Sequence, residues 1–172
     1  MFLKVVILLL CVTYAVSEYV NSADCQNTTV FSKNVQMEVS ECNSEHEHCP
    51  LYQGTVHKVT FHFEPTKDFA SNTDFRVHGV FPKFTVPYGR RGQACDGIVD
   101  EQEACKNSGF VTSQQYKHES TFAVSNTYPK IKLRVRFSMS DRKTKEYLLC
   151  REVPVEIKDP LPTPSPQENE AK

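Results

Sequence analysis

The chain has 172 residues, of which 39% are hydrophobic and 10% aromatic, and its formal net charge at pH 7 is -1. A charge this close to neutral gives no indication of nucleic-acid binding. The length suits a single domain with one hydrophobic core, and we find no internal repeat in the sequence.

The first residues have the pattern of a secretory signal peptide. Lys4 provides a basic start, and an apolar run follows from Val5 to Val12. The run is too short for a membrane span, which needs about 20 apolar residues. We therefore expect a signal peptide over residues 1–17 and an exported mature chain from Glu18, with a second candidate cleavage site after Ser22. We expect its destination to be the extracellular space or the lysosome lumen.

The cysteines outside the signal peptide form an even set, as is typical of an oxidising compartment. They are Cys25, Cys42, Cys49, Cys95, Cys105 and Cys150. Their spacing favours two local disulfides, Cys42 with Cys49 and Cys95 with Cys105. Cys25 and Cys150 are then left to join the two ends of the domain.

The stretch "CNSEHEHC" from Cys42 to Cys49 permits two interpretations. His46 and His48 would complete a zinc site with the two thiolates, whereas export favours oxidation of neighbouring cysteines to a disulfide. We expect the disulfide and no metal, and the imidazoles would then serve at most as a pH-sensitive pair. Nearby, the sequence "NTT" predicts a surface glycosylation site at Asn27.

Alternating apolar and polar residues, the pattern of β-strands, recur along the chain. The alternating segments are Val35–Ser40, Val56–Phe63, Phe75–Phe81, Ser120–Val124, Tyr128–Phe137 and Leu148–Ile157. Turn formers separate these segments, and no long segment beyond the signal peptide has helical spacing. We therefore expect an all-β sandwich of about seven strands. One short helical turn is expected within residues 96–105, with Asp96 as its cap.

Three of the expected strands would bury strongly apolar faces. Those faces are Val59, Phe61 and Phe63; Ile131, Leu133, Val135 and Phe137; and Val153, Val155 and Ile157. In an ordinary sandwich such faces interdigitate and leave few voids. Periodicity alone does not distinguish this solid core from an internal cavity.

Two basic segments have alternative interpretations. Lys130, Lys132, Arg134 and Arg136 form a cationic stripe, which would either dock on an anionic membrane or form an ordinary solvated face. The sequence "GRRG", Gly89–Gly92, would be a mobile loop, a basic contact or a dibasic processing site, of which we favour the loop.

The remaining polar residues do not match a catalytic motif. His57, His62, His78 and His118 accompany neither a G-x-S-x-G elbow nor a zinc-protease motif, so we expect structural roles and no enzyme activity. The C-terminal end has prolines at alternate positions from Pro160 onwards and then a polar, charged segment. This composition predicts a disordered tail over residues 159–172.

Several motifs together resemble one known family. Besides the six cysteines, these are "VHG" at residues 77–79, "VPY" at 86–88, "YPKIKL" at 128–133 and "CREVPVEI" at 150–157. In order and spacing they resemble the ML (MD-2-related lipid-recognition) family, which includes the group-two mite allergens, and within it the Niemann-Pick type C2 group. The resemblance covers about residues 24–158, and we take residues 18–158 as the domain.

The resemblance implies an immunoglobulin-like sandwich whose sheets splay apart around an apolar pocket for a sterol or acyl chain. It also implies the disulfides Cys25–Cys150, Cys42–Cys49 and Cys95–Cys105. In the family's sterol carriers the pocket depends on three positions that correspond here to Tyr88, Val124 and Tyr128. Tyr88 stands where those carriers commonly have Phe.

From these observations we expect a lipid-binding and transfer protein, with Tyr88 and Tyr128 guarding the pocket. The expected pocket residues are Val59, Phe61, Phe63, Tyr88, Val124, Tyr128, Ile131, Leu133, Val135, Phe137, Val153 and Val155. The expected partners are a sterol or fatty acid and, transiently, a membrane surface or membrane receptor, with the protein a monomer and no cofactor. The alternatives are a carrier of fatty acids or hydrophobic signals, and a solid-core module that binds a protein partner without lipid.

Overall fold

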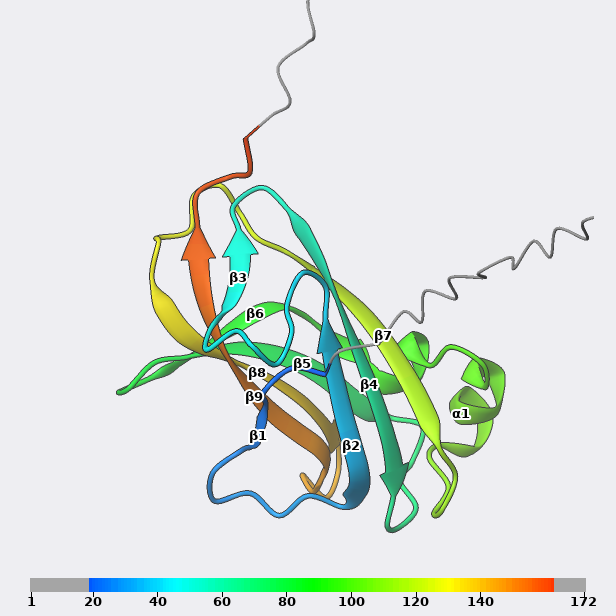
Figure 1. Cartoon of the computed structure of the whole chain (residues 1–172). Helices are drawn as coiled ribbons and strands as arrows, with labels where there is room; N and C mark the ends of the chain where they lie inside the picture. The colour runs from blue at the N-terminus through cyan, green and yellow to red at the C-terminus, as the bar shows by residue number, and fades with distance from the viewer. Residues whose placement is uncertain (1–18, 163–172) are drawn as a thin grey trace, which may run out of the picture.

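The computed structural model describes residues 19–162 and contains mostly β-structure (Figure 1). The strands are β1 (Ala23–Asp24), β2 (Ser32–Val39), β3 (Cys49–Tyr52), β4 (Val56–Pro65), β5 (Thr73–Val80), β6 (Thr85–Gln93), β7 (Tyr116–Ala123), β8 (Lys132–Asp141) and β9 (Tyr147–Lys158). A 3-10 turn (Ala94–Gly97) and one helix, α1 (Gln102–Ser108), lie between β6 and β7. The predicted signal peptide and residues 163–172 of the predicted tail lie outside the described residues. Within residues 19–162, no helix is long and apolar enough to cross a membrane.

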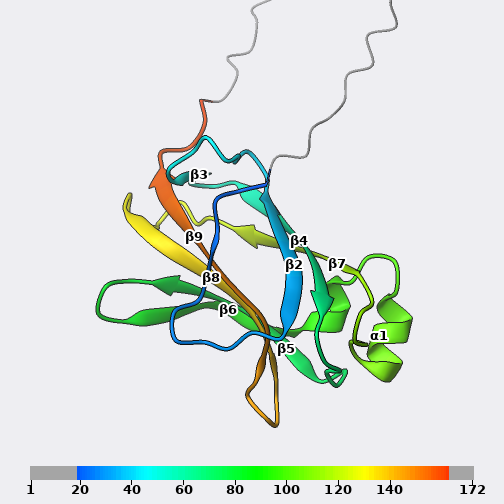
Figure 2. The same ribbon diagram turned by 60° about the horizontal axis from the view of Figure 1, so that its bottom comes forward.

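The strands form two sheets that face each other, which confirms the predicted all-β sandwich. The larger sheet has the order β1-β9-β8-β5-β6, with β3 also pairing in parallel with β9. The smaller sheet has the order β2-β4-β7. Figures 1 and 2 show the two layers and the long β5–β6 hairpin, which extends beyond the body of the sandwich. Strands β6 and β7 are therefore edge strands, one in each sheet.

Strand β6 corrects the interpretation of Gly89–Gly92 as a loop. These residues lie within β6, and the pairing with β5 shifts register between Phe75 and Val77, opposite this segment. The strand was not predicted because "TVPYGRRGQ" lacks apolar alternation, as is common for an exposed edge strand. The helical prediction was also only partly right: α1 begins at Gln102, and Asp96 lies in the preceding 3-10 turn instead of capping α1.

The core lies where the alternating faces of the two sheets meet. Val59, Phe61 and Phe63 of β4 are at most 2% exposed. The ring of Phe61 packs against that of Phe137 from β8 in the opposite sheet, with centroids 5.6 Å apart. This end of the sandwich is solidly packed, as an ordinary protein interior is.

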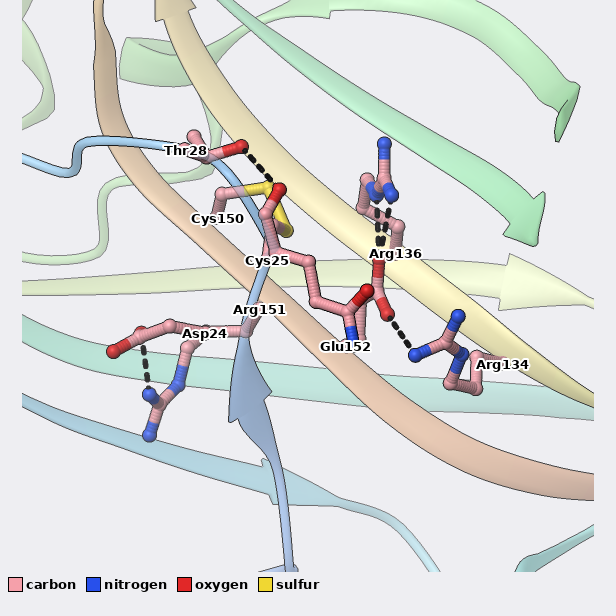
Figure 3. The surroundings of a disulfide bond; sticks show 9 residues. Asp24, Cys25, Thr28, Arg134, Arg136, Cys150, Arg151 and Glu152 are labelled. Carbon is pink, nitrogen blue, oxygen red and sulfur yellow. Dashed lines mark hydrogen bonds and ion pairs between the residues drawn. A yellow bond between two sulfur atoms is a disulfide. The ribbon is translucent and has the colours of Figure 1, made fainter.

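Three disulfides join the chain as predicted. Cys25–Cys150 ties the segment after β1 to β9 across 125 residues of sequence (Figure 3). Closure of so long a loop is worth about 5 kcal/mol on the chain-entropy account. Cys42–Cys49 and Cys95–Cys105 close short loops, so the thiols of "CNSEHEHC" are oxidised and do not form a zinc site.

Candidate ligand-binding cavity

An apolar cavity of about 270 Å³ lies beside the packed core, beneath the β5–β6 hairpin. Strands β5, β6 and β8 and the segment before β8 provide most of its walls, and Phe122 of β7 contributes from the smaller sheet. The lining residues are Val77, His78, Gly79, Phe81, Phe84, Val86, Pro87, Tyr88, Phe122, Tyr128, Pro129, Ile131, Leu133, Val135 and Ile157. A concave, largely apolar surface of this kind is typical of small-molecule sites.

The cavity arises because the two sheets do not stay in contact along the whole of β8. Leu133, Val135 and Phe137 project from the same face of this strand, yet only Phe137, at 1% exposed, is fully buried. Leu133 and Val135 are half-buried and form the cavity wall. Gly79 of β5 preserves this space, since a Cβ atom there would lie 3.2 Å from Cδ1 of Leu133.

A tyrosine joins the two edge strands next to the cavity. The Tyr88 hydroxyl of β6 donates a hydrogen bond to the carbonyl oxygen of Ala123 in β7 and accepts one from the Ala123 N–H at 3.1 Å. Because β6 and β7 belong to different sheets, this pair of bonds, which we term the tyrosine clasp, links the sheets at their open edge. Burial raises the pKa of Tyr88, and the nearby Tyr128 raises it further. The hydrogen bond with Ala123 acts in the opposite direction but does not outweigh them, so the hydroxyl stays protonated at neutral pH.

Tyr128 supports the clasp from the other side of the cavity mouth. Its ring meets that of Tyr88 edge-on, with centroids 6.4 Å apart and an interplanar angle of 77°. The segment that contains Tyr128 is fixed by Gln53, whose side-chain amide donates to the Tyr128 carbonyl oxygen at 2.5 Å. The two tyrosines predicted to guard the pocket thus lie together at its rim.

Two buried histidines lie in the core. His57 stacks on Phe122, with ring centroids 5.6 Å apart, and its Nε2 lies 2.8 Å from the Thr55 hydroxyl. His118 lies 4.6 Å from the Phe75 ring centroid, and burial lowers its pKa to about 4. Both imidazoles are 1% exposed. Within the described residues, no group of three or more His, Cys, Asp or Glu side chains could hold a metal ion.

The structure divides the twelve predicted pocket residues into two groups. Five line the cavity: Tyr88, Tyr128, Ile131, Leu133 and Val135. The other seven are at most 4% exposed and pack in the core beside it: Val59, Phe61, Phe63, Val124, Phe137, Val153 and Val155. Contact of this second group with a ligand stays a prediction.

Several cavity residues were absent from the predicted set. Phe81 and Phe84 stack across the turn of the β5–β6 hairpin, with centroids 4.7 Å apart, and Phe84 remains 59% exposed. Two aromatic residues so close together in a turn were visible in the sequence and could have identified this part of the cavity wall. Phe122 was not selected because its segment, "STFAV", carries few large apolar residues.

Comparison with known proteins gives a consistent result. The profile of the ML domain family matches residues 19–157. The mouse protein named NPC intracellular cholesterol transporter 2 is 30% identical over 160 residues, which cover 91% of this chain and 97% of that protein. The bovine protein of the same name is 26% identical over 146 residues, with coverage of 83% and 88%.

The fold is also found in a solved structure. The crystal structure of a Niemann-Pick type C2 protein from the Japanese carpenter ant superposes with a TM-score of 0.62 at 20% sequence identity. The match covers 81% of this chain and all of the ant chain. The family match, which spans nearly the whole described region, confirms the resemblance found in the sequence: the chain belongs to the ML domain family.

Proposed function

We propose that this protein binds a sterol or a similar hydrophobic molecule between its two sheets and transfers it through transient contact with a membrane or membrane receptor. The observation that carries the proposal is the apolar cavity at the splayed end of the sandwich, bordered by the tyrosine clasp. The name of the mouse relative, a cholesterol transporter, supports a sterol as ligand.

Ligand entry would widen the cavity. Its volume of about 270 Å³ lies just below the range of about 300–1,000 Å³ found for drug-sized ligands. A sterol or long acyl chain would therefore move the sheets further apart and reach core residues such as Phe61 and Val153. The clasp would oppose that movement, since it joins the two sheets at the edge that must open.

The energetics permit binding without covalent chemistry. Burial of about 400 Å² of apolar ligand surface at about 25 cal/mol per Å² contributes about 10 kcal/mol. Association costs of about 4 kcal/mol or more reduce this figure, so micromolar or tighter affinity is expected.

An exported location supports carriage of a lipid through an aqueous space. The predicted signal peptide, the three disulfides and the exposed sequon at Asn27 are all consistent with a secreted or endolysosomal protein. We propose glycosylation at Asn27.

Uptake of an apolar fluorescent dye tests the proposal against the solid-core alternative. Wild-type protein should take up the dye saturably, with displacement by cholesterol or fatty acid. Val135→Arg should abolish uptake, because it places a charge in the cavity wall. Val111→Arg is the matched control at a valine that is already 43% exposed. A folded wild-type protein that takes up no dye would refute the proposal.

A further inference from the structure

A second hollow lies on the opposite face of the larger sheet from the cavity. It is a polar groove of about 420 Å³ over β5, β6 and β8. Arg76, Arg91 and Arg136 reach it from these three strands, and Lys145 reaches it from the turn before β9. The strand register explains the gathering, since Arg76 pairs with Ser138, and His78 with Arg136, on the outward face of neighbouring strands. We term this hollow the arginine groove.

One buried carboxylate organises the arginines at one end of the groove. Asp74 is 1% exposed and lies 2.8 Å from Arg142, 3.2 Å from Arg76 and 3.3 Å from Arg91. Burial alone would raise the pKa of Asp74, but hydrogen bonds from Arg142 and Arg76 and the charges of Arg142 and Arg91 lower it overall. Asp74 is therefore ionised, and its single charge holds three guanidinium groups.

A second buried carboxylate, Glu152, pairs with Arg136 of the groove from outside its lining. Glu152 is 3% exposed and lies 2.6 Å from Arg136 and 3.1 Å from Arg134 (Figure 3). Among its described lining residues the groove has three guanidinium groups and the ammonium of Lys145 but no carboxylate, and its arginines share only the charges of Asp74 and Glu152, which leaves a local surplus of positive charge. This surplus stands out on a chain whose formal net charge is -1.

The predicted cationic stripe shares Arg136 with the arginine groove, but its other members do not line the groove. Lys130 pairs with Asp159 at 3.0 Å, and Arg134 and Arg136 share Glu152. Docking of this stripe on a membrane stays a prediction. The other arginines of the groove, Arg76 and Arg91, lie instead on β5 and β6.

Two buried polar atoms in the arginine groove lack partners. Arg76 Nε and His78 Nδ1 are buried and have no hydrogen-bond partner within the described chain. The hydroxyls of Ser138 and Ser140 line the groove, and no described residue hydrogen-bonds to them. Burial is the main cause that holds the pKa of His78 below its ordinary value. The charges of Arg136 and Arg76 lower it further, which agrees with a positive local potential.

We propose that the arginine groove binds a phosphate group. Guanidinium groups match phosphate oxygens in paired geometry, and the serine hydroxyls add neutral donors beside them. A soluble phosphate ester and the headgroup of a phospholipid share this chemistry. Of the residues that line the groove, only His78 also lines the cavity, so the phosphate site does not depend on the proposed lipid ligand.

Calorimetric titration with inorganic phosphate tests the site in the mature, disulfide-bonded protein. Wild type should bind phosphate saturably, beyond a chloride control at the same ionic strength. Arg91→Gln should raise the Kd about tenfold, as expected for loss of one charge-assisted hydrogen bond. Arg90→Gln is the matched control, because it removes the same charge one residue away and Arg90 does not line the groove. Absence of saturable binding, or equal weakening in both variants, would overturn the proposal.

Folding and ligand source are checked on the same variants. Arg142 and Arg76 still pair with Asp74 in Arg91→Gln, so it should fold. Ser140→Ala, which leaves every arginine in place, should weaken phosphate binding about fivefold. The source of the phosphate is tested by flotation with phosphatidylcholine vesicles, with and without phosphatidylglycerol. If Arg91→Gln binds the anionic vesicles less than Arg90→Gln does, the phosphate belongs to a phospholipid. If the two variants bind equally, it belongs to a soluble ester. Uptake of the apolar dye should be unchanged in all of these variants.

Discussion

Removal of one oxygen atom should open the tyrosine clasp. Tyr88→Phe keeps the ring at the cavity rim but deletes the hydroxyl that bonds to both backbone groups of Ala123. Ala123 is exposed, so water replaces the lost partners and no buried group is left unsatisfied. Each bond is then worth about 0.5–1 kcal/mol, and the pair about 1–2 kcal/mol.

That free energy opposes separation of β6 and β7. If the sheets must part before a ligand enters, Tyr88→Phe should accelerate both loading and release by about 5- to 30-fold. Stopped-flow fluorescence with a fluorescent sterol measures both rates. The equilibrium Kd should change little if the clasp forms again over the bound ligand.

Tyr128→Phe provides the matched control. The Tyr128 ring packs on Tyr88, but within the described residues its hydroxyl makes no hydrogen bond. Its loss should change the rates less than about twofold. Equal rates in Tyr88→Phe, Tyr128→Phe and wild type would refute the gating role of the clasp.

Three other predictions concern stability and capacity. The pKa of His118 is about 4 in the folded protein and about 6.5 in the unfolded chain. The unfolded state therefore takes up the proton first as the pH falls, and the free energy of unfolding should decrease by about 3 kcal/mol between pH 6.5 and 4. Urea unfolding of wild type and His118→Leu measures this, and an equal pH dependence in both would contradict it. Replacement of both Cys25 and Cys150 by Ala should lower the free energy of unfolding by about 2–5 kcal/mol, measured in the same way, and no change would contradict the role of this disulfide. Gly79→Val should reduce dye uptake while the protein stays folded, because its side chain would fill space beside Leu133, and unchanged uptake would show that the dye binds elsewhere.

The sequence identified much of the fold because its strongest patterns are local. The alternation in Val56–Phe63 and Tyr128–Phe137 indicated which side chains point inward, and β4 and β8 have those inward faces. Cysteine spacing indicated the two local disulfides for a similar reason, since short loops restrict the possible partners, and it left Cys25 to pair with Cys150. Strand β6 was missed because an exposed edge strand needs no apolar face.

The cavity itself was not predictable from periodicity. Leu133 and Phe137 have equivalent positions in the alternation, but one borders a cavity and the other is fully buried. The difference depends on the local separation of the two sheets, which is a tertiary property. The tyrosine clasp is also beyond any sequence pattern, because Tyr88 bonds to backbone groups 35 residues away that belong to the other sheet.

Native mass spectrometry of the secreted protein, incubated with cholesterol and with a long-chain fatty acid, tests lipid carriage most directly. We expect one bound lipid per protein in wild type and in Val111→Arg, and none in Val135→Arg. The lipid that binds would also distinguish a sterol carrier from a fatty-acid carrier. A folded wild-type protein that retains neither lipid would contradict the proposed function.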